Sequence, residues 1–171
     1  MRKTLIVGFG NLYRRDDGVA RHIINALLKQ WGRPPLDALD DGWDALGHPV
    51  DVVCLHQLVP ELVETLKNYQ QVIFVDAHVP TEGAPPIYEG TLAVEHRTPF
   101  VYHQTHPSTL LALTQSLYGD APAATLVSVQ GHDFDFGDEL SPSTAALVPA
   151  AVDRILKLVA ATIEPDAWER L

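Results

Sequence analysis

The chain has very little cysteine: Cys54 is the only one among its 171 residues. A single cysteine excludes an internal disulfide and any metal site built from several thiolates. Cys54 stands in the apolar run of residues 52–55. A cysteine in such a run usually packs as a small hydrophobic side chain, so we do not expect it to act as a nucleophile.

Basic residues are also scarce, with 12 Lys and Arg against 22 Asp and Glu and a formal net charge of −10. Nucleic acids and anionic membranes are bound through clustered Lys and Arg, and the basic residues here are scattered. The opening residues reach glycine after only a few apolar positions, which is too short for a signal peptide or a spanning helix. We therefore expect a cytoplasmic, monomeric protein without nucleic-acid or membrane partners.

The sequence lacks the common hydrolase and oxidoreductase motifs as well. It contains neither Gly-x-Ser-x-Gly nor His-Glu-x-x-His, which excludes the usual serine nucleophile and the usual zinc helix. A nicotinamide-dependent enzyme would need an acidic residue at the end of the second strand, where Leu55 and His56 stand instead.

What the sequence does contain is an alternation of apolar runs and amphipathic stretches. This pattern is typical of an α/β fold, and the length predicts one domain over residues 1–171. We predict a three-layer α/β/α sandwich around a five-stranded, mostly parallel, twisted sheet, whose strand 87–94 is antiparallel because its polarity alternates. The predicted strands cover residues 4–8, 50–55, 71–76, 87–94 and 124–129, and the predicted helices cover 18–30, 60–68, 107–118 and 141–163.

A glycine turn follows the first strand and ends in two adjacent carboxylates. Gly8 and Gly10 begin like a dinucleotide-binding loop, but Tyr13 stands where the third glycine belongs. Asp16 and Asp17 would repel a pyrophosphate at the same place. A loop that ends in carboxylates is better suited to a cation.

Three side chains are predicted to meet at the carboxyl edge of the sheet. Asp17 follows the first strand, Asp76 ends the third, and His103 precedes the helix at 107–118. Two carboxylates and an imidazole from separate loops can bind a divalent metal ion and leave positions open for other ligands. The alternative is that Asp76 only caps a turn and that His103 is a surface residue.

The turn resembles the opening motif of the hydrogenase maturation proteases, the endopeptidases that trim the C-terminus of the nickel-iron hydrogenase large subunit. The matching residues are Gly8, Gly10, Asn11, Asp16, Asp17 and Gly18. The resemblance continues through residues 75–77 and 131–142. It implies that Asp17, Asp76 and a histidine at the head of a helix are the metal-binding and catalytic residues. His103 and His106 compete for the third place, and we favour His103.

The resemblance implies an endopeptidase that removes the C-terminal extension of a hydrogenase large-subunit precursor. The nickel would come with the precursor, so no tightly bound cofactor is expected. Gly10, Asn11, Asp16 and His56 are the expected substrate contacts, with Asp16 also a candidate general base or partner of a ligand. Many members carry Asp-Gly-Gly-Thr where this chain has residues 55–58, Leu-His-Gln-Leu. The alternative function is a non-catalytic nickel-checkpoint or metal-binding protein of the same fold.

Overall fold

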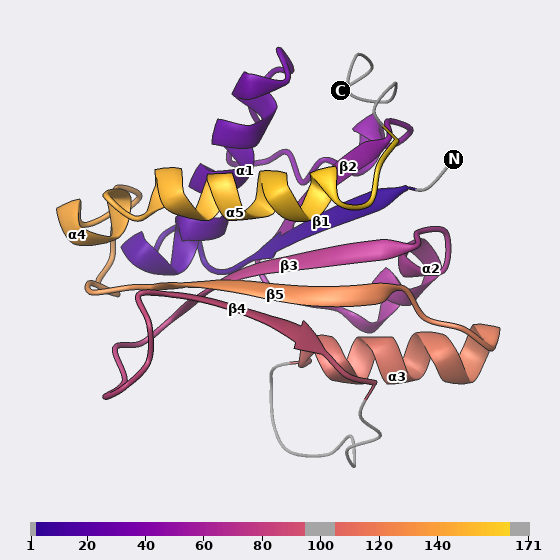
Figure 1. Ribbon diagram of the computed structural model, residues 1–171. Helices are drawn as coiled ribbons and strands as arrows, with labels where there is room; N and C mark the ends of the chain where they lie inside the picture. Colours follow the sequence, from indigo (N-terminus) through magenta and orange to yellow (C-terminus); the bar gives the residue numbers. More distant parts are fainter. Residues whose placement is uncertain (1–2, 95–104, 165–171) are drawn as a thin grey trace.

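The computed structural model describes residues 3–94 and 105–164. Five strands form one sheet in the order β2-β1-β3-β5-β4 (Figure 1). The first four of these are parallel, and β4 runs antiparallel to β5. The strands are β1 Thr4–Phe9, β2 Val50–Leu55, β3 Gln71–His78, β4 Ile87–Leu92 and β5 Ala123–Gln130. The predicted mixed sheet and its single antiparallel strand are confirmed.

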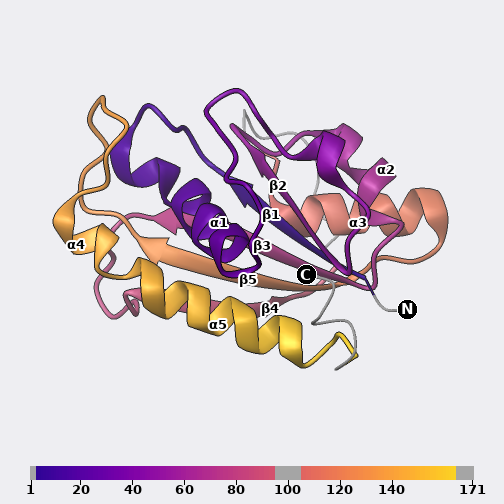
Figure 2. The ribbon, with the colours of Figure 1, turned by 90° about the horizontal axis from the view of Figure 1, so that it is seen from above.

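Helices cover both faces of the sheet, which confirms the three-layer sandwich (Figures 1 and 2). One face carries α1 Val19–Gln30 and α5 Val148–Ala160, and the other carries α2 Val63–Leu66 and α3 Pro107–Tyr118. Each pair of helices closes its own hydrophobic core against the sheet. Within residues 3–94 and 105–164, no helix has the length and apolarity needed to cross a membrane.

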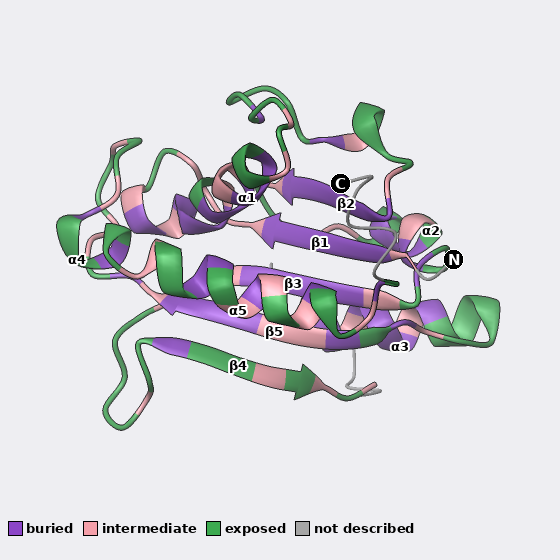
Figure 3. Cartoon of the chain, turned by 45° about the horizontal axis from the view of Figure 1, so that its top comes forward, coloured by how far each residue is buried: buried purple, intermediate pink, exposed green. Residues whose placement is uncertain are grey.

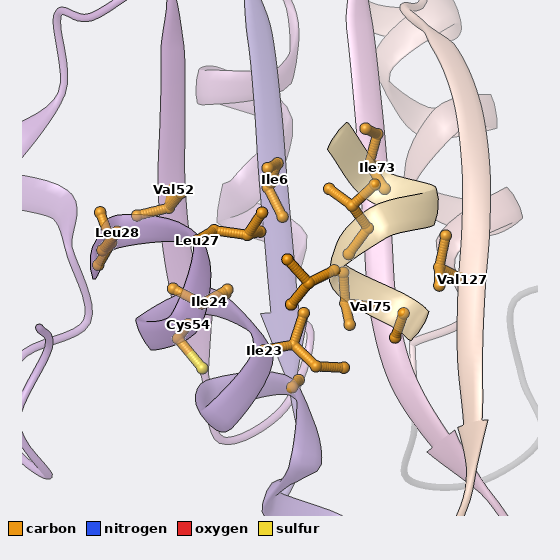
Figure 4. Packing of buried hydrophobic residues seen from close by; sticks show 14 of the residues in the cluster. Ile6, Ile23, Ile24, Leu27, Leu28, Val52, Cys54, Ile73, Val75 and Val127 are labelled. Atoms are coloured by element: carbon orange, nitrogen blue, oxygen red, sulfur yellow. The ribbon is translucent and has the colours of Figure 1, made fainter. Parts of the chain in front are cut away.

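The core under α1 shows why residue pattern and fold agree. Ile23, Ile24 and Leu27 are fully buried and recur at helical spacing, so one side of α1 faces the sheet (Figure 4). Gly8 permits this close approach, because a Cβ there would lie 2.7 Å from the Ile24 Cδ1 atom. In contrast, β4 is largely exposed (Figure 3), as expected for an edge strand.

Two predicted helices are wrong in extent. The single helix at 141–163 is divided into α4 Pro142–Ala145 and α5, and Pro149 lies in the first turn of α5. Proline has no backbone N–H to donate to the carbonyl four residues earlier, so a continuous helix is interrupted here and a new helix begins. The helix at 60–68 is a 3-10 turn, Pro60–Leu62, followed by the one-turn α2. After α2, the backbone N–H groups of Asn68 and Tyr69 donate to carbonyl oxygens three residues earlier, which tightens the chain. The Tyr69 hydroxyl is thereby placed to donate to the Asp51 carboxylate.

Candidate active site

A pocket of about 350 Å³ opens at the carboxyl edge of the sheet, where ligands gather in open α/β folds. It is bounded by the ends of β1, β2 and β3 and by the head of α3. The lining residues are Phe9, Gly10, Asp17, His56, Gln57, Leu58, Asp76, Ala77, Thr105, His106, Pro107 and Leu126. The polar side chains in this set come from four separate segments, which is typical of a site that binds rather than of a packing defect.

The turn after β1 holds the Asp17 carboxylate in place. The Asn11 backbone N–H donates to Asp17 Oδ2 over 2.8 Å, and the Asn11 side chain accepts from Tyr13 N over 2.9 Å. Gly10 lies at φ +144°, and a Cβ there would be only 2.0 Å from the Asp17 carbonyl oxygen. The Gly10 N–H also donates to Leu55 O, which ties this turn to the end of β2. The glycine is therefore required by the turn that supports Asp17.

Asp76 enters the pocket from β3, with one oxygen accepting from the Ala77 backbone N–H over 2.8 Å. Burial raises the pKa of Asp76 to about 7; the Ala77 hydrogen bond lowers it, and the negative charge of Asp17 raises it further. The two carboxylates are thus electrostatic neighbours in one pocket. An acid whose pKa is raised by burial and by a second carboxylate is characteristic of functional sites.

Two histidines line the same pocket. His56 follows β2, and His106 is the N-cap of α3, where its Nδ1 accepts from the Ser108 backbone N–H over 3.2 Å. When Nδ1 of a neutral imidazole accepts, the proton must be on Nε2. In this arrangement His106 offers a hydrogen-bond donor and has no free lone pair for a metal ion.

Asp16 lies elsewhere, although it is the neighbour of Asp17 in sequence. It is fully buried and does not line the pocket. Its Oδ2 accepts from His132 N, Asp133 N and the hydroxyls of Ser141 and Thr144 over 2.7–2.8 Å. Its Oδ1 accepts from Ser141 N over 2.7 Å.

These hydrogen bonds decide the charge state of Asp16. Burial alone would raise its pKa, but the donors from His132, Ser141 and Asp133 outweigh burial and hold the pKa well below its usual range. Asp16 is therefore ionised at neutral pH, and it joins the β1–α1 turn to the loop before α4. We assign it to the fold and not to substrate contact or general-base catalysis.

The structure brings four of the predicted site residues into one pocket: Gly10, Asp17, His56 and Asp76. Asn11 supports Asp17 from behind the pocket wall. The favoured third ligand, His103, lies outside the described residues. Within residues 3–94 and 105–164, no three His, Cys, Asp or Glu side chains converge as a metal site.

Sequence reasoning did not identify Gln57, Leu58 or Thr105 as pocket residues. Gln57 and Leu58 follow directly on His56, so their position after a predicted strand was the available signal. Thr105 carried no comparable signal, because its place depends on how the chain enters α3. His106 was recognised only as an alternative ligand, and its position before Pro107 is the sign of a helix cap.

Comparisons with known proteins add to this geometry. No protein-family model matches the chain, and no curated protein matches it in sequence. Among solved structures, it is similar to the hydrogenase maturating endopeptidase HybD from Escherichia coli, with a TM-score of 0.66 and 20% identity over 94% of this chain and 93% of that one.

Two archaeal structures are similar as well. One is a hydrogenase 2 maturation peptidase from a Thaumarchaeota archaeon, with 22% identity, and the other is HybD from Thermococcus kodakarensis, described as a nickel-iron hydrogenase maturation protease, with 19% identity. Each has a TM-score of 0.61 and covers 93% of this chain and 99% of its own. The chain has the fold of the hydrogenase maturation endopeptidases.

Proposed function

We propose that this protein is an endopeptidase that removes the C-terminal extension of a hydrogenase large-subunit precursor. The observation that carries this proposal is the convergence of Asp17 and Asp76 in one open pocket. The fold around the pocket is shared with proteins named as hydrogenase maturation endopeptidases. Because fold alone does not fix function, the proposal also depends on the side chains that line the pocket.

Nickel in the precursor is the proposed recognition element, with Asp17, Asp76 and His103 completing its coordination. Carboxylate and imidazole ligands without a thiolate bind a divalent ion with modest affinity, and such a set alone would prefer copper to nickel. Selectivity therefore comes from the substrate, which already holds its nickel. The hydrogen bond to His106 Nδ1 supports His103 as the third ligand, because it leaves the proton on His106 Nε2.

The remaining pocket groups then position the peptide for hydrolysis. Water adds to the scissile carbonyl, the C–N bond breaks, and the leaving nitrogen takes up a proton. His56 and His106 are the imidazoles in the pocket that can donate a hydrogen bond to the carbonyl or to the leaving nitrogen. Asp16 takes no direct part in this scheme, because its oxygens are already occupied inside the protein.

The experiment that tests the proposal compares nickel-loaded and nickel-free precursor incubated with the protein. Mass spectrometry should show loss of a C-terminal peptide from the loaded precursor only. Asp17→Asn and Asp76→Asn should abolish this loss and stay folded, because the amide is nearly isosteric with the carboxylate. Asp153→Asn, at an exposed position of α5, is the matched control and should process normally.

The outcomes separate the candidate functions. Binding of the loaded precursor without any cleavage would favour a nickel-checkpoint function over a protease function. Equal cleavage of loaded and nickel-free precursor would remove nickel from the recognition step. Normal cleavage by the Asn variants would move the chemistry away from this pocket.

A further inference from the structure

A second hollow, of about 210 Å³, lies beside the candidate active site. The β1–α1 turn, the end of β2 and the loop over residues 38–41 form its walls. His56 lines both this hollow and the active-site pocket. A polypeptide that leaves the active site on the His56 side therefore reaches the second hollow within a few residues of the scissile bond.

The walls of the hollow are held in place before any ligand arrives. Arg21 donates to the carbonyl oxygens of Asp37 and Asp40, the latter over 2.8 Å, and to Cys54 O over 3.4 Å. The Cys54 N–H in turn donates to Asp41 O over 2.9 Å, which fastens the loop along the outer edge of β2. A preformed hollow binds its ligand at a lower entropic cost than one that must be ordered on binding.

The size of the hollow limits its occupant. A cavity of about 150 Å³ is enough for benzene, and small-molecule sites begin at about 300 Å³. At about 210 Å³ the hollow fits one large side chain and is too small for a cofactor.

The lining chemistry points in the same direction. Leu39 and Tyr13 line the hollow with 94% and 57% of their surfaces exposed, and Leu55 also lines it. An apolar side chain placed in the hollow would bury part of these exposed apolar surfaces, which favours an apolar occupant. Asp40, Asp41 and Arg21 also line the hollow. The Arg21 guanidinium already donates to the carbonyl oxygens of Asp37 and Asp40, and the two carboxylates outnumber it, so an acidic occupant is disfavoured.

We propose that this hollow is a specificity subsite that binds one apolar side chain of the substrate polypeptide, of leucine or phenylalanine size, and rejects an acidic one. The identity of that polypeptide as a hydrogenase precursor rests on the function proposed above. The preference of the hollow for an apolar group rests only on its own walls. The two parts can therefore be tested separately.

The first test measures the hollow without any cleavage. Backbone amide resonances are followed by NMR while N-acetyl-phenylalaninamide, N-acetyl-leucinamide or the α-amide of N-acetyl-aspartic acid, which keeps its side-chain carboxylate, is added. The apolar probes should shift the amides of residues 38–41 and 54–56, and the acidic probe should not. Ala38→Trp fills the hollow and should remove these shifts. Absence of shifts, or equal shifts with the acidic probe, overturns the subsite.

The second test uses the nickel-loaded precursor as substrate. Leu39→Asp should raise KM about tenfold with kcat within about twofold of wild type, because it removes binding that is equal in ground and transition states. Leu39 is almost fully exposed, so its replacement leaves the fold intact. Leu117→Asp, at an exposed leucine on α3, is the matched control and should leave KM unchanged.

These results distinguish the two proposals. Cleavage by the wild type together with an unchanged KM for Leu39→Asp overturns the subsite and leaves the protease standing. Absence of cleavage together with shifts from the apolar amides overturns the protease and supports an apolar binding hollow on this surface.

Discussion

Replacement of Asp16 by Asn tests the division of roles between the two adjacent aspartates. The amide fits the same space but has one oxygen and one NH₂ group. If its oxygen takes the place of Oδ2, the four donors that converge there keep their acceptor. The NH₂ group must then face the Ser141 N–H, which now donates to Oδ1. Two donors meet, and the Ser141 N–H loses its partner.

The magnitude follows from these contacts. An orphaned buried N–H costs about 1–3 kcal/mol. The four remaining bonds lose their charge assistance, at about 0.5–1 kcal/mol each, and such losses are not fully additive. We therefore expect Asp16→Asn to lower the free energy of unfolding by about 3–5 kcal/mol, out of the roughly 5–15 kcal/mol typical of a domain. For a chain of this length that corresponds to a Tm lower by about 10 °C.

The assay is urea and thermal unfolding of both aspartate variants. Asp17→Asn is the matched control, because among the described residues Asp17 accepts only from Asn11 N, and an amide oxygen can replace that acceptor. It should change the free energy of unfolding by less than about 1 kcal/mol. Equal stability of Asp16→Asn and wild type, or a larger loss in Asp17→Asn, would refute the assignment.

The pH dependence of this difference is a second readout. The hydrogen bonds to Asp16, working against burial, lower its folded pKa below the ordinary 3.8. The stability contributed by the ionised group is therefore fully present above about pH 5 and is lost as the pH falls below the ordinary pKa. Wild type and Asp16→Asn should approach each other in stability under acid conditions.

The other predictions concern the pocket. Burial, with a further contribution from Asp17, raises the pKa of Asp76 from 3.8 to about 7, so wild type loses stability as the pH rises from about 4 to 7. In metal-free urea titrations Asp76→Asn should be unchanged at pH 4 and more stable by about 4 kcal/mol at pH 8.5. His103→Ala should abolish processing, whereas His106→Ala should only slow it and lose about 1 kcal/mol of capping; the reverse ranking in a processing assay would make His106 the ligand. Gly10→Ala should destabilise far more than Gly32→Ala in thermal unfolding, because both lie at positive φ but only Gly10 is blocked, by the Asp17 carbonyl.

The sheet could be predicted because buried parallel strands are continuous apolar runs. The cores of all five strands were predicted, and their ends differ from the structure by two residues or fewer. The closing helix was harder, because the apolar period continues on both sides of the break. Pro149 marks the restart, but a proline in a first turn is recognisable only once that turn is located.

The candidate site, too, could be predicted from the sequence only in part. Asp17 and Asp76 could be placed because Asp17 follows the first strand and Asp76 lies at the carboxyl end of the third, and the carboxyl ends of parallel strands share an edge. The role of Asp16 could not be predicted, because its partners lie 116 to 128 positions further along the chain. Nothing in the local pattern distinguishes a carboxylate that faces a pocket from one that faces Ser141 and Thr144.

The buried carboxylate also has a consequence for the pocket. Arg15, directly before the aspartates, lies at φ +42°, a strained value for a residue with a side chain. Its N–H donates to Gly137 O over 2.9 Å, and its guanidinium pairs with Asp133 over 3.2 Å. These contacts and the Asp16 network fix the turn from which Asp17 projects. The Asp17 carboxylate is thereby held in the same pocket as Asp76, and no described residue forms an ion pair with either of them.

We expect Asp16 to orient Asp17 as well as to stabilise the fold, and the coupling can be measured. If Asp16 acts only on stability, Asp16→Asn assayed well below its Tm should process the precursor at the wild-type rate. If it orients Asp17, the rate should fall about tenfold even in folded protein, as expected for a group that supports a metal-binding side chain. A wild-type rate in folded Asp16→Asn would show that Asp16 contributes only stability and does not orient Asp17.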